Sequence, residues 1–175
     1  MLVEAIAAGD RLAFEALYRC YFPRLSRFLQ RVLRHSHMVD EVLNDTMYVV
    51  WHKAATFNGK SKVSTWIFAI GYRRALKALA GFDEALEFDP EQAESPAPGP
   101  DRILMDRERD ELLARALAQM TPDHRAVIEL TYFHGCRYQE IAQIVGCPVD
   151  TVKTRMFHAR KRLRCLLPEY QEQQP

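Results

Sequence analysis

Residues 138–164 read YQEIAQIVGCPVDTVKTRMFHARKRLR, and this stretch decides the fold of the second half of the chain. Ile141, Ala142 and Val145 recur at helical spacing, Gly146 supplies a tight turn, and a second helical pattern follows. Two short helices joined by such a turn are typical of a helix-turn-helix motif. The motif predicts binding to double-stranded DNA, because a helix fits into the major groove.

The second helix of this motif is apolar on one side and basic on the other. Apolar residues recur at steps of three and four positions: Val152, Met156, Ala159, Leu163 and Leu166. The candidate DNA contacts on the remaining surface are Lys153, Thr154, Arg155, Phe157, His158, Arg160 and Lys161. The first of these are placed to reach base edges, and the later cations to hold phosphates. The simpler alternatives are a solvated basic helix without a partner and a Phe157 that packs inward.

Helical patterns fill most of the remaining chain, and no segment reads as a strand. Helices are expected over residues 11–34, 36–54, 64–80, 102–119, 122–134, 138–145 and 148–167. Asp10, Ser36 and Thr121 are the expected N-caps of three of them, and Pro23 is expected to kink or break the first. The predicted fold class is therefore all-α.

An acidic, proline-rich segment separates the helical patterns into two parts. Residues 82–101 read FDEALEFDPEQAESPAPGPD, with four prolines, seven acidic residues and little periodicity. This composition is typical of a flexible linker. We therefore expect two small helical domains, over residues 1–81 and 102–175, joined by this linker.

The net charge of +1 hides an uneven distribution of charge. Residues 1–82 hold 12 Lys and Arg against 6 Asp and Glu, residues 83–110 hold 3 against 10, and residues 111–175 hold 9 against 7. Basic segments on both sides of an acidic one favour a nucleic-acid partner, although solvated charged faces would give the same pattern.

The composition disfavours several classes of protein. No apolar run approaches the roughly 20 residues needed to cross a bilayer, and the amino terminus lacks the pattern of a secretory signal. The four cysteines, at positions 20, 136, 147 and 165, form no CxxC pair, so we expect neither a zinc site nor a disulfide framework. We expect a cytoplasmic protein without a metal or other cofactor.

The helix expected over residues 36–54 carries a compact acidic and polar surface. Asp40, Glu41, Asn44 and Asp45 share one side of it, and we call them the acidic stripe. Paired carboxylates can serve in acid–base catalysis, but no pocket residues accompany them here, so we expect no enzyme activity. A solvated face and a docking surface for a basic partner both fit this pattern.

Residues 57–79, FNGKSKVSTWIFAIGYRRALKAL, form a basic–aromatic segment. Such a mixture suits single-stranded DNA, whose bases stack on rings while cations hold the phosphates. The candidate contacts are the loop Asn58, Gly59, Lys60, Ser61 and Lys62, followed by Arg73, Arg74 and Lys77. The rings of this segment are Phe57, Trp66, Phe68 and Tyr72. Trp66, Ile67 and Ile70 are more simply explained as core residues.

Two long runs of the chain together resemble a known family, the extracytoplasmic-function (ECF, group IV) sigma factors. Residues 39–79 are similar to the family's run of an acidic pair, a Trp, an F-x-G loop and a Thr-Trp-Leu helix. Residues 113–164 resemble the family's final domain nearly end to end. The resemblance implies a sigma factor, the subunit of bacterial RNA polymerase that directs promoter recognition, promoter melting and transcription initiation.

The resemblance also implies a partner for each candidate surface. The acidic stripe would dock on the clamp coiled coil of the largest subunit of core RNA polymerase. The candidate contacts of the basic–aromatic segment would bind the melted minus-ten strand, and those of the last helix would bind the minus-thirty-five element as duplex. Catalysis would belong to the polymerase, and regulation would come from a separate anti-sigma protein.

One departure from the family and one alternative function bear on these expectations. Arg137 stands where the family usually has a Ser or Thr helix cap, so we expect the start of that helix to fray. The alternative is a stand-alone helix-turn-helix regulator, which would bind duplex operators tightly without polymerase. A pure interaction protein that uses the acidic stripe without any DNA role is the third candidate.

Overall fold

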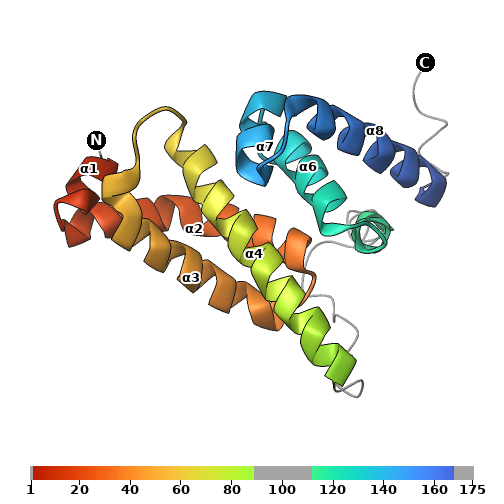
Figure 1. Ribbon diagram of the computed structural model, residues 1–175, viewed down its shortest axis with the longest axis horizontal. Coiled ribbons are helices and arrows are strands. Elements are labelled where there is room, and N and C mark those ends of the chain that lie inside the picture. Colours follow the sequence, from red (N-terminus) through yellow and green to blue (C-terminus); the bar gives the residue numbers. More distant parts are fainter. Residues whose placement is uncertain (1, 89–111, 168–175) are drawn as a thin grey trace, which may run out of the picture.

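The computed structural model describes residues 2–88 and 112–167 (Figure 1). The first group of helices is α1 (Leu2–Ala7), α2 (Arg11–Leu33), α3 (Ser36–Lys53), the short 3-10 helix η1 (Ala54–Thr56) and α4 (Val63–Phe88). The second group is a helical segment over 112–118, followed by α6 (Pro122–Tyr132), α7 (Tyr138–Val145) and α8 (Val149–Leu166). No strand occurs within the described ranges, which confirms the all-α prediction.

The first group is built around one apolar core. Helices α2, α3 and α4 pack on one another, and each buries the face on which apolar residues recur every three or four positions. The fully buried side chains include Leu25, Phe28, Leu29, Leu43 and Ile67. Gly71 lets α2 and α4 approach closely, because a Cβ at this position would lie 3.0 Å from Leu25 Cδ1.

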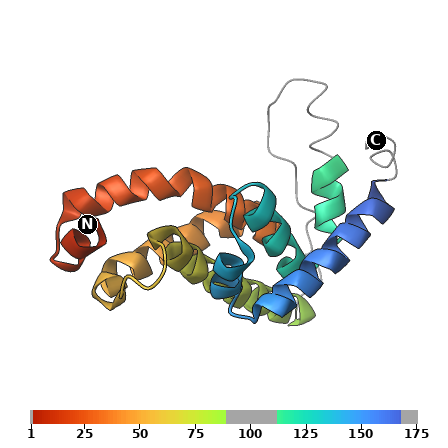
Figure 2. The same ribbon diagram turned by 90° about the horizontal axis from the view of Figure 1, so that it is seen from above.

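Helix α2 begins where the sequence predicts. Asp10 Oδ1 accepts hydrogen bonds from the backbone N–H groups of Leu12 (2.9 Å) and Ala13 (3.1 Å), as an N-cap does. The helix then continues through Pro23 and follows one long arc (Figure 2). Of the kink or break expected at Pro23, the break is absent. Apolar residues on both sides of the proline are buried, and this packing offsets the backbone hydrogen bond that proline cannot donate.

The start of helix α3 differs from the prediction. His35 occupies the N-cap position, without a capping hydrogen bond from its side chain, and Ser36 is the first helical residue. The chain turns one residue earlier than expected, because Arg34 adopts a left-handed backbone conformation with φ of 66°. The end of α2 therefore decides where α3 begins.

Helix α4 extends further than its sequence pattern indicated. It runs to Phe88, past the expected end at residue 80 and into the segment predicted as linker. Residues 83–88 contain neither glycine nor proline, whereas Pro90 cannot continue a helix. The rest of the linker and the first part of the helix expected over 102–119 lie outside the described residues.

The second group contains the predicted helix-turn-helix. Thr121 Oγ1 accepts a hydrogen bond from His124 N (3.3 Å), and Pro122 is the first residue of α6, which confirms the predicted cap. Gly146 adopts φ of +71° between α7 and α8, a conformation that costs glycine little. The three helices share a core that includes Val127, Leu130, Ile141, Val152 and Met156.

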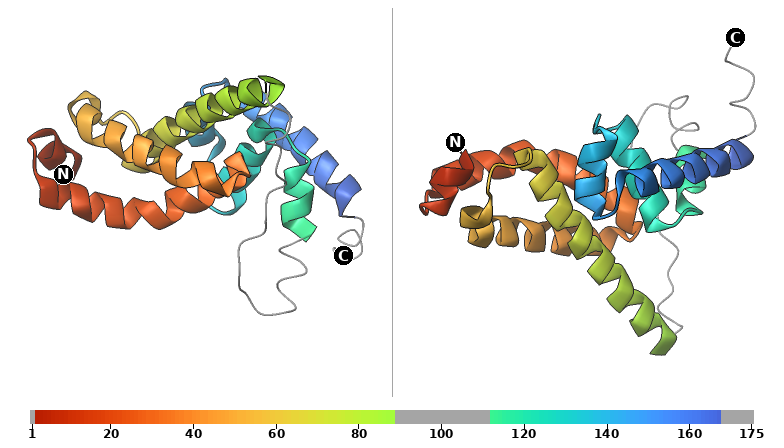
Figure 3. Two further views of the ribbon diagram at one scale, coloured as in Figure 1. Left: turned by 90° about the horizontal axis from the view of Figure 1, so that it is seen from below. Right: turned by 45° about the horizontal axis from the view of Figure 1, so that its top comes forward.

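The two groups of helices pack directly on each other. Helix α4 contacts α7, and helix α2 contacts α6 (Figures 1 and 3). The helix-turn-helix therefore rests against the helix that follows the loop over 58–62, although more than 50 residues separate Tyr72 from the α6 residue that it contacts.

Candidate nucleic-acid interface

Helix α8 exposes the basic side that the sequence predicts. Val152, Met156 and Ala159 are buried, and α8 packs on α6 and α7, so its other side faces solvent. Phe157 is 65% exposed, and the alternative in which it packs inward is therefore wrong. The other exposed candidate contacts are Lys153, Thr154, His158, Arg160 and Lys161.

Two of these cations are held by exposed partners within the second group. Lys153 Nζ lies 2.9 Å from Asp150 Oδ1, one turn earlier in the same helix. Arg160 Nε donates a hydrogen bond to the hydroxyl of Tyr132 (2.9 Å), and its guanidinium lies over that ring. Exposed contacts of this kind contribute little free energy, so both cations remain available to phosphates.

Arg155 differs from its neighbours on α8, because its side chain is largely covered. Its Nη2 lies 2.5 Å from Asp123 Oδ2, and its Nη1 donates to Cys147 Sγ at 3.7 Å. These contacts direct the guanidinium toward the start of α6. In this arrangement Arg155 does not face the surface on which Lys153 and Phe157 lie exposed.

The loop over residues 58–62 is exposed and locally ordered. Asn58 Oδ1 accepts a hydrogen bond from Lys60 N (3.1 Å), and Gly59 adopts φ of +71°. Lys62 reaches across to the second group, where its Nζ lies 2.6 Å from Glu140 Oε1. That carboxylate also accepts a hydrogen bond from Arg137 N (2.8 Å). The start of α7 is therefore capped by Glu140, and the fraying expected there is not observed.

The charged residues of α4 lie beside the acidic stripe. Arg73 and Lys77 are exposed, and Arg74 Nη1 lies 3.8 Å from Asp45 Oδ2. A basic surface on α4 thus adjoins an acidic surface on α3. The two surfaces attract partners of opposite charge, so a polyanion bound to α4 would be repelled by the stripe.

The aromatic residues of the basic–aromatic segment divide into two pairs. Phe57 and Trp66 are half-buried, with ring centroids 5.3 Å apart. Phe68 and Tyr72 are buried, and the Phe68 ring lies 4.9 Å from the ring of His134 in the second group. Phe68 and Tyr72 thus face the helix-turn-helix part of the molecule. Ile67 and Ile70 are core residues, as predicted.

All four residues of the acidic stripe are exposed on the surface of α3. Asp40, Glu41, Asn44 and Asp45 are exposed, while the opposite side of the helix is buried. The same exposed side continues one turn further, where the rings of Tyr48 and His52 lie 4.2 Å apart. The stripe is therefore a solvent-facing surface with an aromatic extension.

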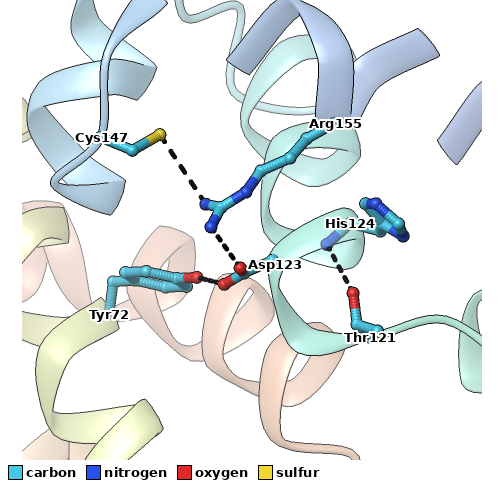
Figure 4. Close-up of polar contacts among 6 residues, drawn as sticks. All are labelled: Tyr72, Thr121, Asp123, His124, Cys147 and Arg155. Atoms are coloured by element: carbon cyan, nitrogen blue, oxygen red, sulfur yellow. Dashed lines mark hydrogen bonds and ion pairs between the residues drawn. The ribbon is translucent and has the colours of Figure 1, made fainter. Parts of the chain in front are cut away.

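Asp123, on α6, links the two groups of helices through a hydrogen bond. The sequence pattern did not predict this link. The hydroxyl of Tyr72, on α4, donates a hydrogen bond to Asp123 Oδ1, and Arg155, on α8, contacts the other carboxylate oxygen (Figure 4). Burial, followed by the hydrogen bond to Asp123, raises the pKa of Tyr72. The tyrosine therefore remains a neutral donor throughout the physiological range.

A second set of polar groups lies buried between the two groups of helices. Arg125 donates hydrogen bonds to Met120 O and, across the interface, to Val32 O, both at 2.6 Å. Glu129 and His134 are also buried, and among the described residues Glu129 Oε2 and His134 Nε2 have no hydrogen-bond partner. No sequence pattern marked these residues, because their burial depends on the neighbouring group.

Burial favours the neutral forms of both Glu129 and His134. It raises the pKa of Glu129 to about 7, against the opposing effect of Arg31 and Arg27. Burial, with the nearby Arg24 and Arg27, lowers the pKa of His134 to about 4. With Glu129 Oε1 and His134 Nε2 3.9 Å apart, the two groups make no close ion pair near neutral pH.

The part of the chain that the structure describes contains no candidate metal site. No three His, Cys, Asp or Glu side chains lie together there in a way that could hold a metal ion. The four cysteines are free, with Cys20 and Cys165 exposed. The described helices include none that is long and apolar enough to cross a membrane.

These features define an all-helical protein with two groups of helices, one of which carries a helix-turn-helix with an exposed basic side. The chain matches the family model for Sigma-70 region 2 over residues 17–81 and the model for Sigma-70, region 4 over residues 110–163. It is 30% identical to the ECF RNA polymerase sigma factor RpoE of Cereibacter sphaeroides over 156 residues, which cover 89% of this chain and 86% of that protein. It is 25% identical to the RNA polymerase sigma-H factor of Pseudomonas aeruginosa over 173 residues, covering 93% and 90%.

Two solved structures share the fold. One is the sigma factor RpoE in complex with the anti-sigma factor NepR from Bartonella quintana, with a TM-score of 0.76, 23% identity and coverage of 89% of this chain and 96% of that one. The other is CnrH in complex with the cytosolic domain of CnrY, with a TM-score of 0.70, 24% identity and coverage of 96% of both chains.

The chain belongs to the ECF sigma factors of RNA polymerase. It therefore functions in promoter recognition and transcription initiation, and the prediction of a sigma factor is confirmed over that of a stand-alone regulator.

Proposed function

We propose that this sigma factor uses three separate surfaces for three targets. The acidic stripe binds the clamp coiled coil of the largest subunit of core RNA polymerase. The loop over 58–62, with Arg73, Arg74 and Lys77, binds the melted minus-ten strand. Helix α8 binds the minus-thirty-five element as duplex, through the exposed Lys153, Thr154, Phe157, His158, Arg160 and Lys161, and Arg155 joins them only when it is released from Asp123.

The observation that carries this proposal is the separation of charge over α3, α4 and α8. The stripe on α3 exposes three carboxylates, which repel phosphates and suit a basic protein surface. The exposed cations of α4 and α8 suit phosphates, and α8 has the form of a helix that enters a major groove. Each surface therefore favours one partner and disfavours the other.

The proposal leaves catalysis to the polymerase and requires no cofactor of this chain. It places the protein in the cytoplasm, where core polymerase and promoter DNA are found. It also includes an anti-sigma protein as a regulator, because one solved structure of similar fold holds the sigma factor RpoE with the anti-sigma factor NepR, and another holds CnrH with the cytosolic domain of CnrY.

The experiment that tests this function is run-off transcription. The purified chain is combined with sigma-free core polymerase on fragmented genomic DNA of the source organism, and transcript starts are sequenced. We expect discrete starts that share two spaced upstream motifs. Binding to core polymerase without any specific start, or tight operator binding without polymerase, would contradict the proposal.

A further inference from the structure

Two neighbouring aromatic side chains are exposed at the end of α6, and each lies beneath an arginine from a different group of helices. We call these groups the first and second domains. Tyr132 is 57% exposed and Phe133 is 54% exposed. The guanidinium of Arg160, on the recognition helix α8 of the second domain, lies over the Tyr132 ring, whereas that of Arg31, on α2 of the first domain, lies over the Phe133 ring. The two rings therefore contact cations of two different surfaces.

Tyr132 holds Arg160 by two contacts at once. Arg160 Nε donates a hydrogen bond of 2.9 Å to the Tyr132 hydroxyl, and Arg160 Cζ lies 5.8 Å from the centroid of the ring. The residues are 28 positions apart, so the contact joins the end of α6 to α8, which packs on it. A hydrogen bond at one edge and a ring beneath one face restrict both the direction and the plane of a guanidinium.

The contact with Tyr132 leaves Arg160 suited to a phosphate. Its hydrogen-bond partner is a hydroxyl, which does not compensate the charge of the guanidinium, whereas Arg155 on the same helix is paired with the carboxylate of Asp123. The hydroxyl uses only Nε, one of the five N–H donors of the guanidinium. The edge that carries Nη1 and Nη2 can then donate two parallel hydrogen bonds to two oxygens of one phosphate.

We propose that Tyr132 is a positioning residue for DNA binding, which holds Arg160 so that its Nη edge meets a phosphate of the duplex bound by α8. A free arginine side chain loses rotamer freedom when it binds a phosphate, and an arginine that is already held loses less. Tyr132 therefore strengthens duplex binding through Arg160 without touching the DNA itself. This inference rests on the proposed function, because it supports one of the DNA contacts assigned there.

Phe133 provides the matched control within the same helix. It is exposed to nearly the same extent as Tyr132 and also lies beneath an arginine, but Arg31 is not one of the proposed DNA contacts. A general effect of removing a ring from the end of α6 should appear in both Tyr132→Ala and Phe133→Ala. An effect that acts through Arg160 should appear in Tyr132→Ala alone.

The test is a double-mutant cycle of Tyr132→Ala and Arg160→Ala. Holoenzyme is formed from each full-length chain and core polymerase, and fluorescence anisotropy measures its binding to a duplex that carries the upstream motif of a promoter found by run-off transcription. We expect Arg160→Ala to weaken duplex binding about fivefold and Tyr132→Ala about threefold. Once Arg160 is replaced, Tyr132→Ala should weaken binding no further, because it acts only through that arginine.

A salt series adds a readout that a purely structural role of Tyr132 would not change. Arg160→Ala should reduce the salt slope by about 0.9, the value for one phosphate contact, and Tyr132→Ala should reduce it by part of that amount. Phe133→Ala should leave both affinity and slope unchanged. Circular dichroism shows whether each chain keeps its helices. If Tyr132→Ala does not, the cycle is repeated with Tyr132→Phe, which keeps the ring and should weaken binding about twofold.

Three results would overturn the positioning role. Tyr132→Ala could weaken binding equally with and without Arg160, it could leave binding unchanged although Arg160→Ala weakens it, or Phe133→Ala could weaken binding as much as Tyr132→Ala. Failure of the proposed function is distinguishable, because it is seen as absence of specific run-off starts from the unmodified chain. If Arg160→Ala itself leaves duplex binding unchanged, Arg160 is not a DNA contact and the role of Tyr132 is refuted with it.

Discussion

The core of the first domain and the surface between the domains are held together by different interactions. The core consists of apolar side chains such as Leu25, Leu43 and Ile67, which are fully buried where α2, α3 and α4 pack on one another. The interdomain surface contains Asp123 and other charged or polar groups, some of them buried without a partner among the described residues.

This difference explains how one chain can be both stable and adjustable. Apolar burial is non-directional and costs nothing in unsatisfied polar groups, so the core is stable in any relative position of the domains. The interdomain surface adds directional polar contacts, each worth about 0.5–1.5 kcal/mol in net free energy, to ring contacts such as that of Phe28 with His134. Conditions and partners therefore act first on the interdomain surface.

The largest effect is expected for a change that breaks the core. Leu25→Ala removes a fully buried side chain that packs against Gly71 of α4 and leaves a cavity. We expect the free energy of unfolding to fall by about 2–5 kcal/mol, measured by urea denaturation. Leu12→Ala is the control, because Leu12 is 78% exposed and its truncation should change stability very little.

A large effect on binding, without an effect on stability, is expected at the acidic stripe. Glu41→Lys with Asp45→Lys reverses two exposed charges on α3 and should weaken core polymerase binding by at least about a hundredfold, because like charges would then face each other. Binding is measured by biolayer interferometry with immobilised core polymerase. Undiminished binding would refute the docking surface, and Glu15→Lys on α2 controls for charge reversal elsewhere.

A smaller effect is expected for a single cation of the recognition helix. Lys153→Ala should weaken duplex promoter binding by the holoenzyme about fivefold and leave core polymerase binding unchanged. Measured by anisotropy over a salt series, it should also reduce the salt slope by about 0.9 if Lys153 contacts a phosphate. Equal loss of both activities would contradict separate surfaces, and Arg11→Ala on α2 is the matched control.

The smallest effect is the pH dependence of the interdomain surface. Burial where the two groups of helices pack raises the pKa of Glu129 to about 7, so the packed arrangement binds a proton more tightly than separated domains would and loses stability as the pH rises toward and through 7. The lowered pKa of His134 has the opposite effect on stability, because it destabilises the packed arrangement as the pH falls below about 6.5. The effect of Glu129 therefore dominates only above that pH. From pH 6.5 to 8.5 the ratio of chains with packed domains to chains with separated domains should fall by about twofold to fourfold.

Fluorescence energy transfer between dyes on the exposed Cys20 and Cys165 measures this ratio. In Glu129→Gln the transfer should be constant from pH 6.5 to 8.5, because the titrating group is gone. Glu140, whose pKa is lowered by Lys62 and by the Arg137 N–H, is already ionised in this range. An unchanged pH response in Glu129→Gln would rule out Glu129 as its source.

Features that depend on neighbouring residues were predictable from the sequence. Asp10 and Thr121 cap their helices through backbone N–H groups two or three positions away, and Gly146 forms its turn within the motif itself. The exposed positions of the acidic stripe follow from helical periodicity in the same way. The roles proposed for the stripe and for the DNA-contacting residues remain predictions.

Features that depend on distant parts of the chain were missed. One local feature was missed as well, because Ser36 was expected to cap α3 and Arg34 turns the chain one residue earlier. Phe68 and Tyr72 were candidates to stack on bases, and here they face the second domain. The sequence pattern does not distinguish Arg155 from the other cations of α8, whereas in the structure it pairs with Asp123.

The sequence by itself determined the helices, their exposed and buried faces, the helix-turn-helix and the membership of a family. The tertiary structure alone decided which of these surfaces are covered, because Tyr72 and Asp123 are 51 positions apart and Val32 and Arg125 are 93 positions apart. Helical periodicity reports which side of a helix is apolar over a few turns. Helical periodicity does not indicate which residues of another domain pack against that side.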